Sequence, residues 1–152
     1  MDAIDVKIIN ALLANSRTST TKISESLKIS NVATQQRISK LEKAGIITGY
    51  TARVNYSAIG MKTIAYVGIF LEKAKHYEDV IDQLKQVPQI TQAHFTTGNY
   101  SIFAKITAKD NENLMEILSS RIQNIDGIAR TETFISLHEG INQSLFLSSE
   151  EE

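Results

Sequence analysis

The chain has no cysteine and no tryptophan, and Pro88 is its only proline. Without cysteine it can form neither disulfide bonds nor thiolate metal sites. Its three histidines, His76, His94 and His138, lack the spacing of ligands on one helix, so we predict no metal and no cofactor. No apolar run approaches the roughly eighteen residues of a membrane span, and no charged-then-apolar leader is present. These absences favour a cytoplasmic protein without a signal peptide.

The sequence also lacks the residue groups that carry common enzyme chemistry. No constellation of histidine or serine stands out, no glycine-rich phosphate-binding loop is present, and no carboxylate pair can be assigned to a pocket. We therefore predict that the chain is not an enzyme. Hydrophobic residues make up 42% of the 152 residues, enough to bury the core of one domain or two small ones.

The charge of the chain is unevenly distributed although its net value is only −1. Residues 1–60 hold five Lys and three Arg against two Asp and two Glu, whereas residues 61–152 are net acidic. A basic first part on a nearly neutral protein indicates contact with a polyanion. Ordinary variation of surface charge is the alternative explanation, so charge alone decides nothing.

Residues 23–50 have the pattern of two short helices joined by a tight turn and followed by a β-prone run. The second helix has a narrow inner face and an outer face of short polar and cationic side chains. Ser30 and Asn31 are suited to cap its start and Gly45 to end it. The residues on the inner face are Thr34, Ile38, Leu41 and Gly45.

A further helix precedes these two, and Asp2 can cap it. Three helices followed by a strand at Ile47–Asn55 predict a winged helix-turn-helix, whose second motif helix enters the major groove of DNA. We assign residues 1–60 to this DNA-binding domain and its linking strand. Arg37 contacts either phosphate or a nearby acid such as Glu42. The candidate DNA-binding residues are Ser30, Asn31, Val32, Gln35, Gln36, Arg37, Ser39, Lys40 and Lys43.

Residues 61–152 have a different pattern, in which apolar β-prone runs alternate with amphipathic helices. Gly98-Asn99 is a two-residue hairpin signal between two of the strands. The order β-α-β-β-α-β predicts a ferredoxin-like module, which gives the whole chain an α+β fold. The predicted elements are Thr63–Leu71, Tyr77–Val87, Ile90–Thr97, Tyr100–Thr107, Asn113–Ile125 and Ile128–Leu137.

The sheet of such a module has helices on one face only, so its other face must meet solvent, a ligand or another subunit. Apolar strand residues make a solvated face unfavourable, and we predict self-association. The candidates for this open face are Ile64, Tyr66, Ile69 and Phe103. The three glutamates at 150–152 are expected to be a solvated end.

This arrangement resembles the Lrp/AsnC (feast/famine) family of transcription regulators. The resemblance covers almost the whole chain and includes Asn15-Ser16-Arg17, a recognition region from Arg37 to Tyr50, and TTGNYSIF at 96–103. TTGNYSIF and the TET run at 131–133 are most similar to the asparagine-responsive AsnC branch, because many leucine-responsive relatives have Asp where this chain has Ser101. In this family the ferredoxin-like unit is called the RAM module.

The resemblance implies a sequence-specific DNA-binding transcription regulator that responds to a small amino-acid effector, asparagine or a similar one. It also implies a homodimer formed through the sheets, with four dimers closing into an octamer around which DNA can wrap. The implied effector site lies between dimers. Its candidate residues are Gly98, Asn99, Tyr100, Ser101, Arg130, Thr131, Glu132 and Thr133.

Each site has a simpler explanation from the residues alone. Gly98-Asn99 can be only a turn, since both residues tolerate positive φ, and Tyr100 can be an aromatic packing across the sheet. The alternative function is an amino-acid-binding oligomeric sensor that acts through protein partners. The basic helix-turn-helix distinguishes the two hypotheses, because a pure sensor does not need one.

Overall fold

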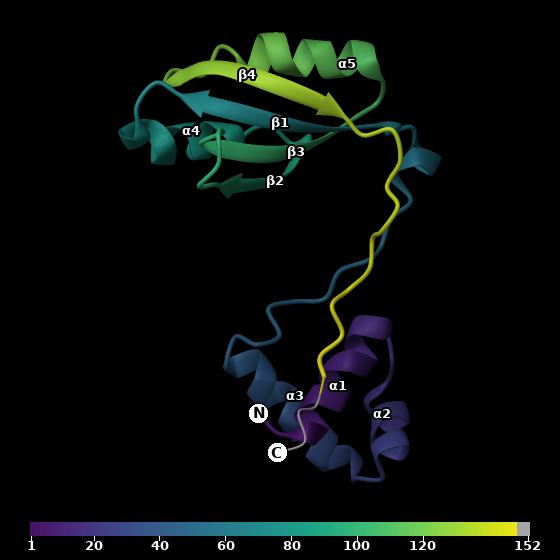
Figure 1. Ribbon diagram of the computed structural model, residues 1–152. Helices are drawn as coiled ribbons and strands as arrows, with labels where there is room; N and C mark the ends of the chain where they lie inside the picture. Colours follow the sequence, from purple (N-terminus) through teal and green to yellow (C-terminus); the bar gives the residue numbers. More distant parts are fainter. Residues whose placement is uncertain (149–152) are drawn as a thin grey trace. The chain divides into compact units, whose positions relative to one another are not determined.

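The computed structural model describes residues 1–148 of the 152, so the glutamates at 150–152 lie outside the described residues. The chain forms two compact units (Figure 1). The first contains Met1–Val54 together with the chain from Ile141 onward, and the second is Asn55–Gly140. The first unit is therefore built from two stretches that are far apart in the sequence.

Three helices form the first unit: α1 (Ala3–Ala14), α2 (Thr20–Leu27) and α3 (Asn31–Lys43). Each begins after a residue whose side chain accepts hydrogen bonds from the first turn: Asp2, Ser19 and Ser30. At Asp2 the cap is a reciprocal capping box with Asp5. The predicted caps at Asp2 and Ser30 are thus confirmed.

The core of this unit is a small aliphatic cluster of Ile8, Ile9, Ile23 and Leu41, with Ile38 and Leu147 packed against it. Gly45 follows α3 with φ of 69°, and Ile46 N–H donates to Leu41 O. This is a Schellman ending, which needs a left-handed residue and explains the glycine.

One predicted element of the first unit is wrong. Ile47–Asn55 forms no strand in the described structure, and the chain instead passes through an irregular segment into a short 3-10 helix at Tyr56–Ile59. A β-prone segment becomes a strand only when another strand pairs with it, and no described residue of this chain does so.

The second unit is a four-stranded antiparallel sheet in the order β2-β3-β1-β4. It confirms the predicted β-α-β-β-α-β order. Its strands are β1 (Thr63–Leu71), β2 (Ile90–Phe95), β3 (Ile102–Ala108) and β4 (Ile128–Ile135). Its helical parts are a 3-10 turn at Ala74–His76, α4 (Tyr77–Leu84), α5 (Asn111–Glu116) and a π-helical continuation at Ile117–Ile122.

Helices α4 and α5 pack on the same face of the sheet. Val80 and Leu84 of α4 and Leu114 of α5 share one core with Ala65, Val67 and Ile69 of β1. Ile69 is fully buried there, so its assignment to the open face was wrong. Successive strand residues point to opposite faces, and Ile69 has the same parity as Ala65 and Val67.

The connection between β2 and β3 also differs from the prediction. It runs from Thr96 to Ser101, and neither Gly98 nor Asn99 has a positive φ. The two-residue turn was therefore wrong. The connection contains six residues and is closed by the hydrogen bond from Thr96 N–H to Ser101 O. A loop of this length does not need the left-handed conformations of a tight hairpin.

Candidate nucleic-acid interface and effector site

Helix α3 presents a continuous polar surface. Asn31, Val32, Gln35, Gln36, Lys40 and Lys43 are exposed, and Ser39 is half-buried between them. Val32 is 68% exposed although it is apolar. Among the described residues neither lysine forms an ion pair. The surface therefore combines hydrogen-bonding groups, a methyl surface and two available cations.

The opposite side of α3 fixes the helix in its motif. Thr34 is fully buried, and its hydroxyl donates to Ser30 O at 3.1 Å. Asn31 Nδ2 donates to Thr21 Oγ1 at 3.1 Å, which ties the start of α3 to α2. Between these helices Lys28 has φ of 56°. The tight turn between the two helices is thus made by a left-handed lysine where glycine would be free of strain.

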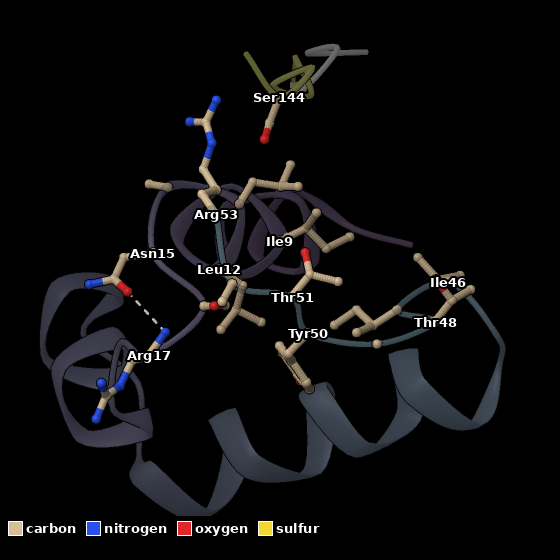
Figure 2. Close-up of a pocket in the computed structure, with 16 residues that line it drawn as sticks. Ile9, Leu12, Asn15, Arg17, Ile46, Thr48, Tyr50, Thr51, Arg53 and Ser144 are labelled. Carbon is tan, nitrogen blue, oxygen red and sulfur yellow. Dashed lines mark hydrogen bonds between the residues drawn. The ribbon is translucent and has the colours of Figure 1, made fainter. Parts of the chain in front are cut away.

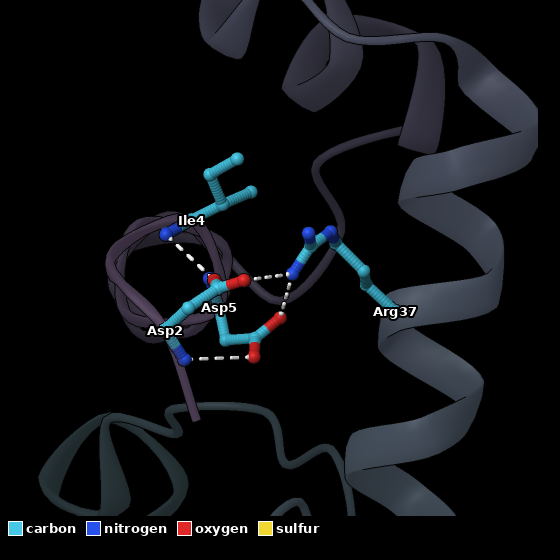
Figure 3. A network of polar contacts seen from close by, with 4 residues as sticks. All are labelled: Asp2, Ile4, Asp5 and Arg37. Atoms are coloured by element: carbon cyan, nitrogen blue, oxygen red, sulfur yellow. Dashed lines mark hydrogen bonds and ion pairs between the residues drawn. The ribbon is translucent and has the colours of Figure 1, made fainter.

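Arg37 points away from the polar surface and toward α1 (Figure 3). Its Nη1 donates to Asp2 Oδ2 at 2.7 Å and to Asp5 Oδ1 at 2.8 Å. Of the two predicted roles, the structure shows the pairing with acids. Asp2 and Asp5, rather than Glu42, are the partners; the carboxylate of Glu42 instead accepts from the hydroxyl of Tyr50 at 2.8 Å.

The two acids therefore serve both the start of α1 and the position of α3. Asp5 N–H donates to the Asp2 carboxylate, and this bond, together with the Arg37 guanidinium, holds the pKa of Asp2 below its ordinary value. The same carboxylates raise the pKa of Arg37. A helix cap and an inter-helix ion pair share one cluster, so a change in one affects the other.

The open face of the sheet carries five of the ten aromatic side chains of the chain. Tyr66 stacks on Phe103 with ring centroids 5.8 Å apart, and Tyr100 lies 5.8 Å from Phe103 and 5.2 Å from Phe70. Phe134 completes this group, 6.2 Å from Tyr100. We call these five residues the aromatic face.

A charged group lies at one end of the aromatic face. The Tyr100 hydroxyl donates to Glu132 Oε2 at 2.9 Å, and Arg130 pairs with the other oxygen of the same carboxylate. The Arg130 guanidinium also lies 3.6 Å from the centre of the Phe70 ring, a cation–π contact. Hydrogen bonds from Arg130 and Tyr100 lower the pKa of Glu132, and the bond to Glu132 raises the pKa of Tyr100.

The candidate effector residues are divided between the two faces of the sheet. Arg130 and Glu132 lie opposite Phe70 and Gly68 on the aromatic face, whereas Thr131 and Thr133 lie opposite Ile69 and Val67 on the helix face. Gln123 at the end of the π-helical segment donates to the Thr131 hydroxyl at 3.2 Å. The alternation of a strand causes this division.

The remaining candidates belong to the β2–β3 connection. Gly98 and Asn99 are exposed. Ser101 N–H donates to Ile69 O at 2.9 Å, and its hydroxyl accepts from Leu71 N–H. Ser101 therefore anchors the connection to β1 and holds Tyr100 over the sheet. Sequence reasoning did not find Phe70 or Gly68, although the strand parity of Tyr66 points to both.

A pocket lies elsewhere, in the first unit (Figure 2). Its volume is about 510 Å³, and it lies between α1 and the irregular segment from Ile46 to Arg53. Its floor is apolar, with Ile9 and Leu12, while Arg17, Arg53 and Ser144 lie at its rim. None of the candidate effector residues lines it. Among the described residues no group of acids and histidines could hold a metal ion, and no helix is long and apolar enough to cross a membrane.

Comparison with known proteins agrees with both units. Residues 1–48 match the winged helix-turn-helix DNA-binding family, and residues 64–144 match the Lrp/AsnC ligand binding domain. The chain is 34% identical to the regulatory protein AsnC of Escherichia coli K12 over 145 residues, which are 95% of each protein. It is also 34% identical to the transcriptional regulator LrpA of Pyrococcus horikoshii, over 86% of this chain and 92% of that protein.

Solved structures show the same fold. The structure of E. coli AsnC superposes with a TM-score of 0.91 at 33% identity, covering 97% of this chain and 99% of that one. A Neisseria meningitidis transcriptional regulator in complex with L-methionine superposes with a TM-score of 0.92 at 20% identity, covering 99% of this chain and 97% of that one. The second likeness supports the fold alone. The predicted fold class, α+β with a winged helix-turn-helix and a ferredoxin-like module, is confirmed.

These relatives are transcription regulators, which confirms that the function is regulatory and not enzymatic. A DNA-binding motif and an amino-acid-binding module in one chain are the two parts of an effector-controlled regulator. The chain belongs to the Lrp/AsnC family and is a DNA-binding transcription regulator that responds to a small amino acid.

Proposed function

We propose that the exposed surface of α3 reads the operator. Gln35 and Gln36 have the side-chain amides that can pair with adenine edges in the major groove, and Val32 offers methyl groups to thymine. Ser30, Asn31 and Ser39 supply further hydrogen-bonding groups, and Lys40 and Lys43 supply charge for phosphates. In this proposal residues 1–60 act as the DNA-binding domain and residues 61–152 as the regulatory and oligomerisation domain.

Arg37 has a different part in this interface. Its side chain is only 32% exposed, and its guanidinium binds the carboxylates of Asp2 and Asp5 at the start of α1. It acts through the position of α3 and not through contact with bases. Replacing Arg37 is therefore expected to weaken binding to all DNA sequences alike. Loss of a base contact, in contrast, weakens binding to the operator more than binding to random DNA.

For the effector, we propose asparagine or a polar amino acid of similar size. The single observation that carries this proposal is the Arg130–Glu132–Tyr100 group, because it offers one charge of each sign beside a hydroxyl. An amino acid has a carboxylate for Arg130 and an ammonium group for Glu132. Arg130 and Glu132 are 59% and 41% exposed, so both can exchange their mutual contact for contacts with a ligand.

The other candidate residues complete the proposed pocket from the sides. Gly98 and Asn99 contribute main-chain groups of the β2–β3 connection, and Ser101 fixes this connection on β1 through its bond to Ile69 O. Thr131 and Thr133 point to the helix face, so within one chain they cannot share a ligand with Glu132. A site that uses all of them requires a second subunit, which agrees with an effector bound between dimers.

We propose a homodimer formed through the aromatic face, with four dimers in an octamer as the working assembly. Five aromatic side chains on the uncovered side of the sheet favour burial against a second copy. Because a transcription regulator must reach its operator, we propose a cytoplasmic location.

Calorimetry against the twenty amino acids tests the proposed effector. We expect heat from asparagine or a close relative, and a loss of at least tenfold in affinity in Arg130→Ala and in Glu132→Gln. Arg121→Ala is the matched control, since Arg121 is an exposed arginine outside the proposed site. Absence of heat from every amino acid, or equal binding in Arg130→Ala and Arg121→Ala, would contradict the proposed site.

A further inference from the structure

The chain beyond the sheet returns to the DNA-binding unit and binds helix α1. Asn10 Nδ2 donates to Leu147 O at 2.8 Å, and Leu147 N–H donates to Asn10 Oδ1 at 2.9 Å. One carboxamide thus satisfies both main-chain groups of one residue, as a neighbouring strand would. The two residues are 137 positions apart in the sequence, so this contact is tertiary.

The contact is centred on a single apolar side chain. Leu147 packs against the cluster of Ile8, Ile9, Ile23 and Leu41 and is half-buried. Its neighbours behave differently: Leu145 is 82% exposed and Phe146 is 54% exposed. Leu147 is therefore the residue through which this segment binds α1.

Two further contacts hold residues that precede Leu147 in the same segment. Arg53 donates to the carbonyl of Asn142 at the start of the segment. Ser144 extends over the rim of the pocket beside Ile9 and Arg53 (Figure 2). The segment thus touches both the irregular run after α3 and helix α1.

We propose that α1 carries a docking site for a leucine-centred chain segment, that its occupant is Ile141–Ser148 of this chain, and that docking is reversible. Occupancy adds a second connection between the DNA-binding unit and β4, besides the linker that precedes β1. Only residues 136–140 separate Ile141 from Ile135, the last residue of β4. This inference does not depend on the identity of the effector or of the operator.

Reversibility follows from the size of the contact. One half-buried leucine and two hydrogen bonds provide a weak interaction in trans. Within one chain, a short flexible tether presents such a segment at an effective concentration on the order of a millimolar. The docked state therefore exceeds the free state by only about tenfold, in contrast to a permanent core contact.

Hydrogen exchange of the full-length protein, followed by mass spectrometry, tests the proposal. In the wild type we expect the Leu147 amide, which donates to Asn10 Oδ1, to exchange about tenfold more slowly than free chain, because a contact that opens often gives modest protection. Asn10→Ala and Leu147→Ala should each abolish this protection. Leu145→Ala is the matched control and should leave it unchanged, since that side chain lies in solvent.

Three outcomes overturn the proposal. Exchange of the Leu147 amide at the free rate in the wild type means that the segment does not dock. Protection that survives both Asn10→Ala and Leu147→Ala means that another surface holds it. Protection as strong as that of α1 itself means that the segment is a permanent part of the unit. The same experiment measures exchange within α1. A variant that unfolds loses protection there, whereas a variant that only loses docking keeps it.

Discussion

The ring of Tyr100 lies directly on the backbone of Gly68. A β-carbon at position 68 would lie 2.3 Å from Tyr100 Cδ1 and 2.5 Å from Tyr100 Cγ. Such distances are impossible for non-bonded carbons, so any larger residue displaces the ring. Gly68 faces Glu132 across the β1–β4 pair, and the glycine thereby allows Tyr100 to reach that carboxylate.

Gly68→Ala is expected to lower the free energy of unfolding by about 1–3 kcal/mol, the usual effect of overpacking a filled site. Urea denaturation measures this. Gly140→Ala is the control, because a β-carbon there has no neighbour within 4 Å. If the two variants are equally stable, the Tyr100 ring does not rest on Gly68 in solution.

Acid should weaken the attachment of α3 to α1. The pKa of Asp2 is lowered from its ordinary value of 3.8 by hydrogen bonds from Asp5 N–H and Arg37. A lowered folded-state pKa contributes stability above 3.8 that is lost as pH falls through the folded value. Thermal unfolding between pH 7 and pH 3 should show a smaller acid-dependent decrease in Asp2→Asn, which keeps a capping side chain. An acid dependence identical to that of the wild type would contradict this role for Asp2.

DNA binding should distinguish Gln36 from Lys40. Gln36→Ala is expected to weaken binding to the operator by about 1–3 kcal/mol more than binding to random DNA, if the Gln36 contact is bidentate. Lys40→Ala should weaken both alike and reduce the salt slope by about one. Gel-shift titrations at several salt concentrations measure both effects, with Lys109→Ala as the charge-matched control in the other unit. Wild-type affinity in both α3 variants would remove this helix from the interface.

Self-association should depend on the aromatic face. Phe103→Asp places a charge between the rings of Tyr66 and Tyr100 and should shift the protein toward monomer at micromolar concentration. Light scattering measures the mass. Met115→Asp is the control, because Met115 is a large exposed apolar residue on α5. A monomeric wild type, or a Phe103→Asp variant of wild-type mass, would contradict the proposed interface.

The backbone conformation at Lys28 should favour glycine over alanine. A left-handed non-glycine residue costs about 1–2 kcal/mol, and the φ of 56° at Lys28 has this conformation. Lys28→Gly should therefore be more stable than Lys28→Ala by about 1 kcal/mol in urea denaturation. Both variants lose the same charge, so the comparison isolates the backbone. A more stable alanine variant would show that this turn is not left-handed in solution.

Elements with local sequence signals were predicted well. Thr63–Leu71 has the predicted bounds, because a long, apolar and β-prone run is typical of a central strand. The ending of α3 at Gly45 and the cap at Asp2 were also predictable, since both depend on neighbouring residues. The strand at 47–55 was not, because pairing depends on what lies opposite.

The site was less predictable than the fold, and the reason is the same. The side on which a strand residue lies follows from parity, so Thr131 and Glu132 could have been assigned to opposite faces from the sequence. The pairing of Arg37 with Asp2 and Asp5 joins residues more than thirty positions apart. No pattern in the sequence relates Asn10 to Leu147, because their contact is tertiary and leaves no local signal around either residue.

That return sets an order for folding. Asn55–Gly140 is continuous in sequence, so the sheet unit can fold as soon as it leaves the ribosome. The cluster on α1 is synthesised first, yet Leu147 reaches it only after β4 has been made. Among the described residues, the helix-turn-helix therefore receives its last apolar neighbour only after every strand of the sheet has been synthesised.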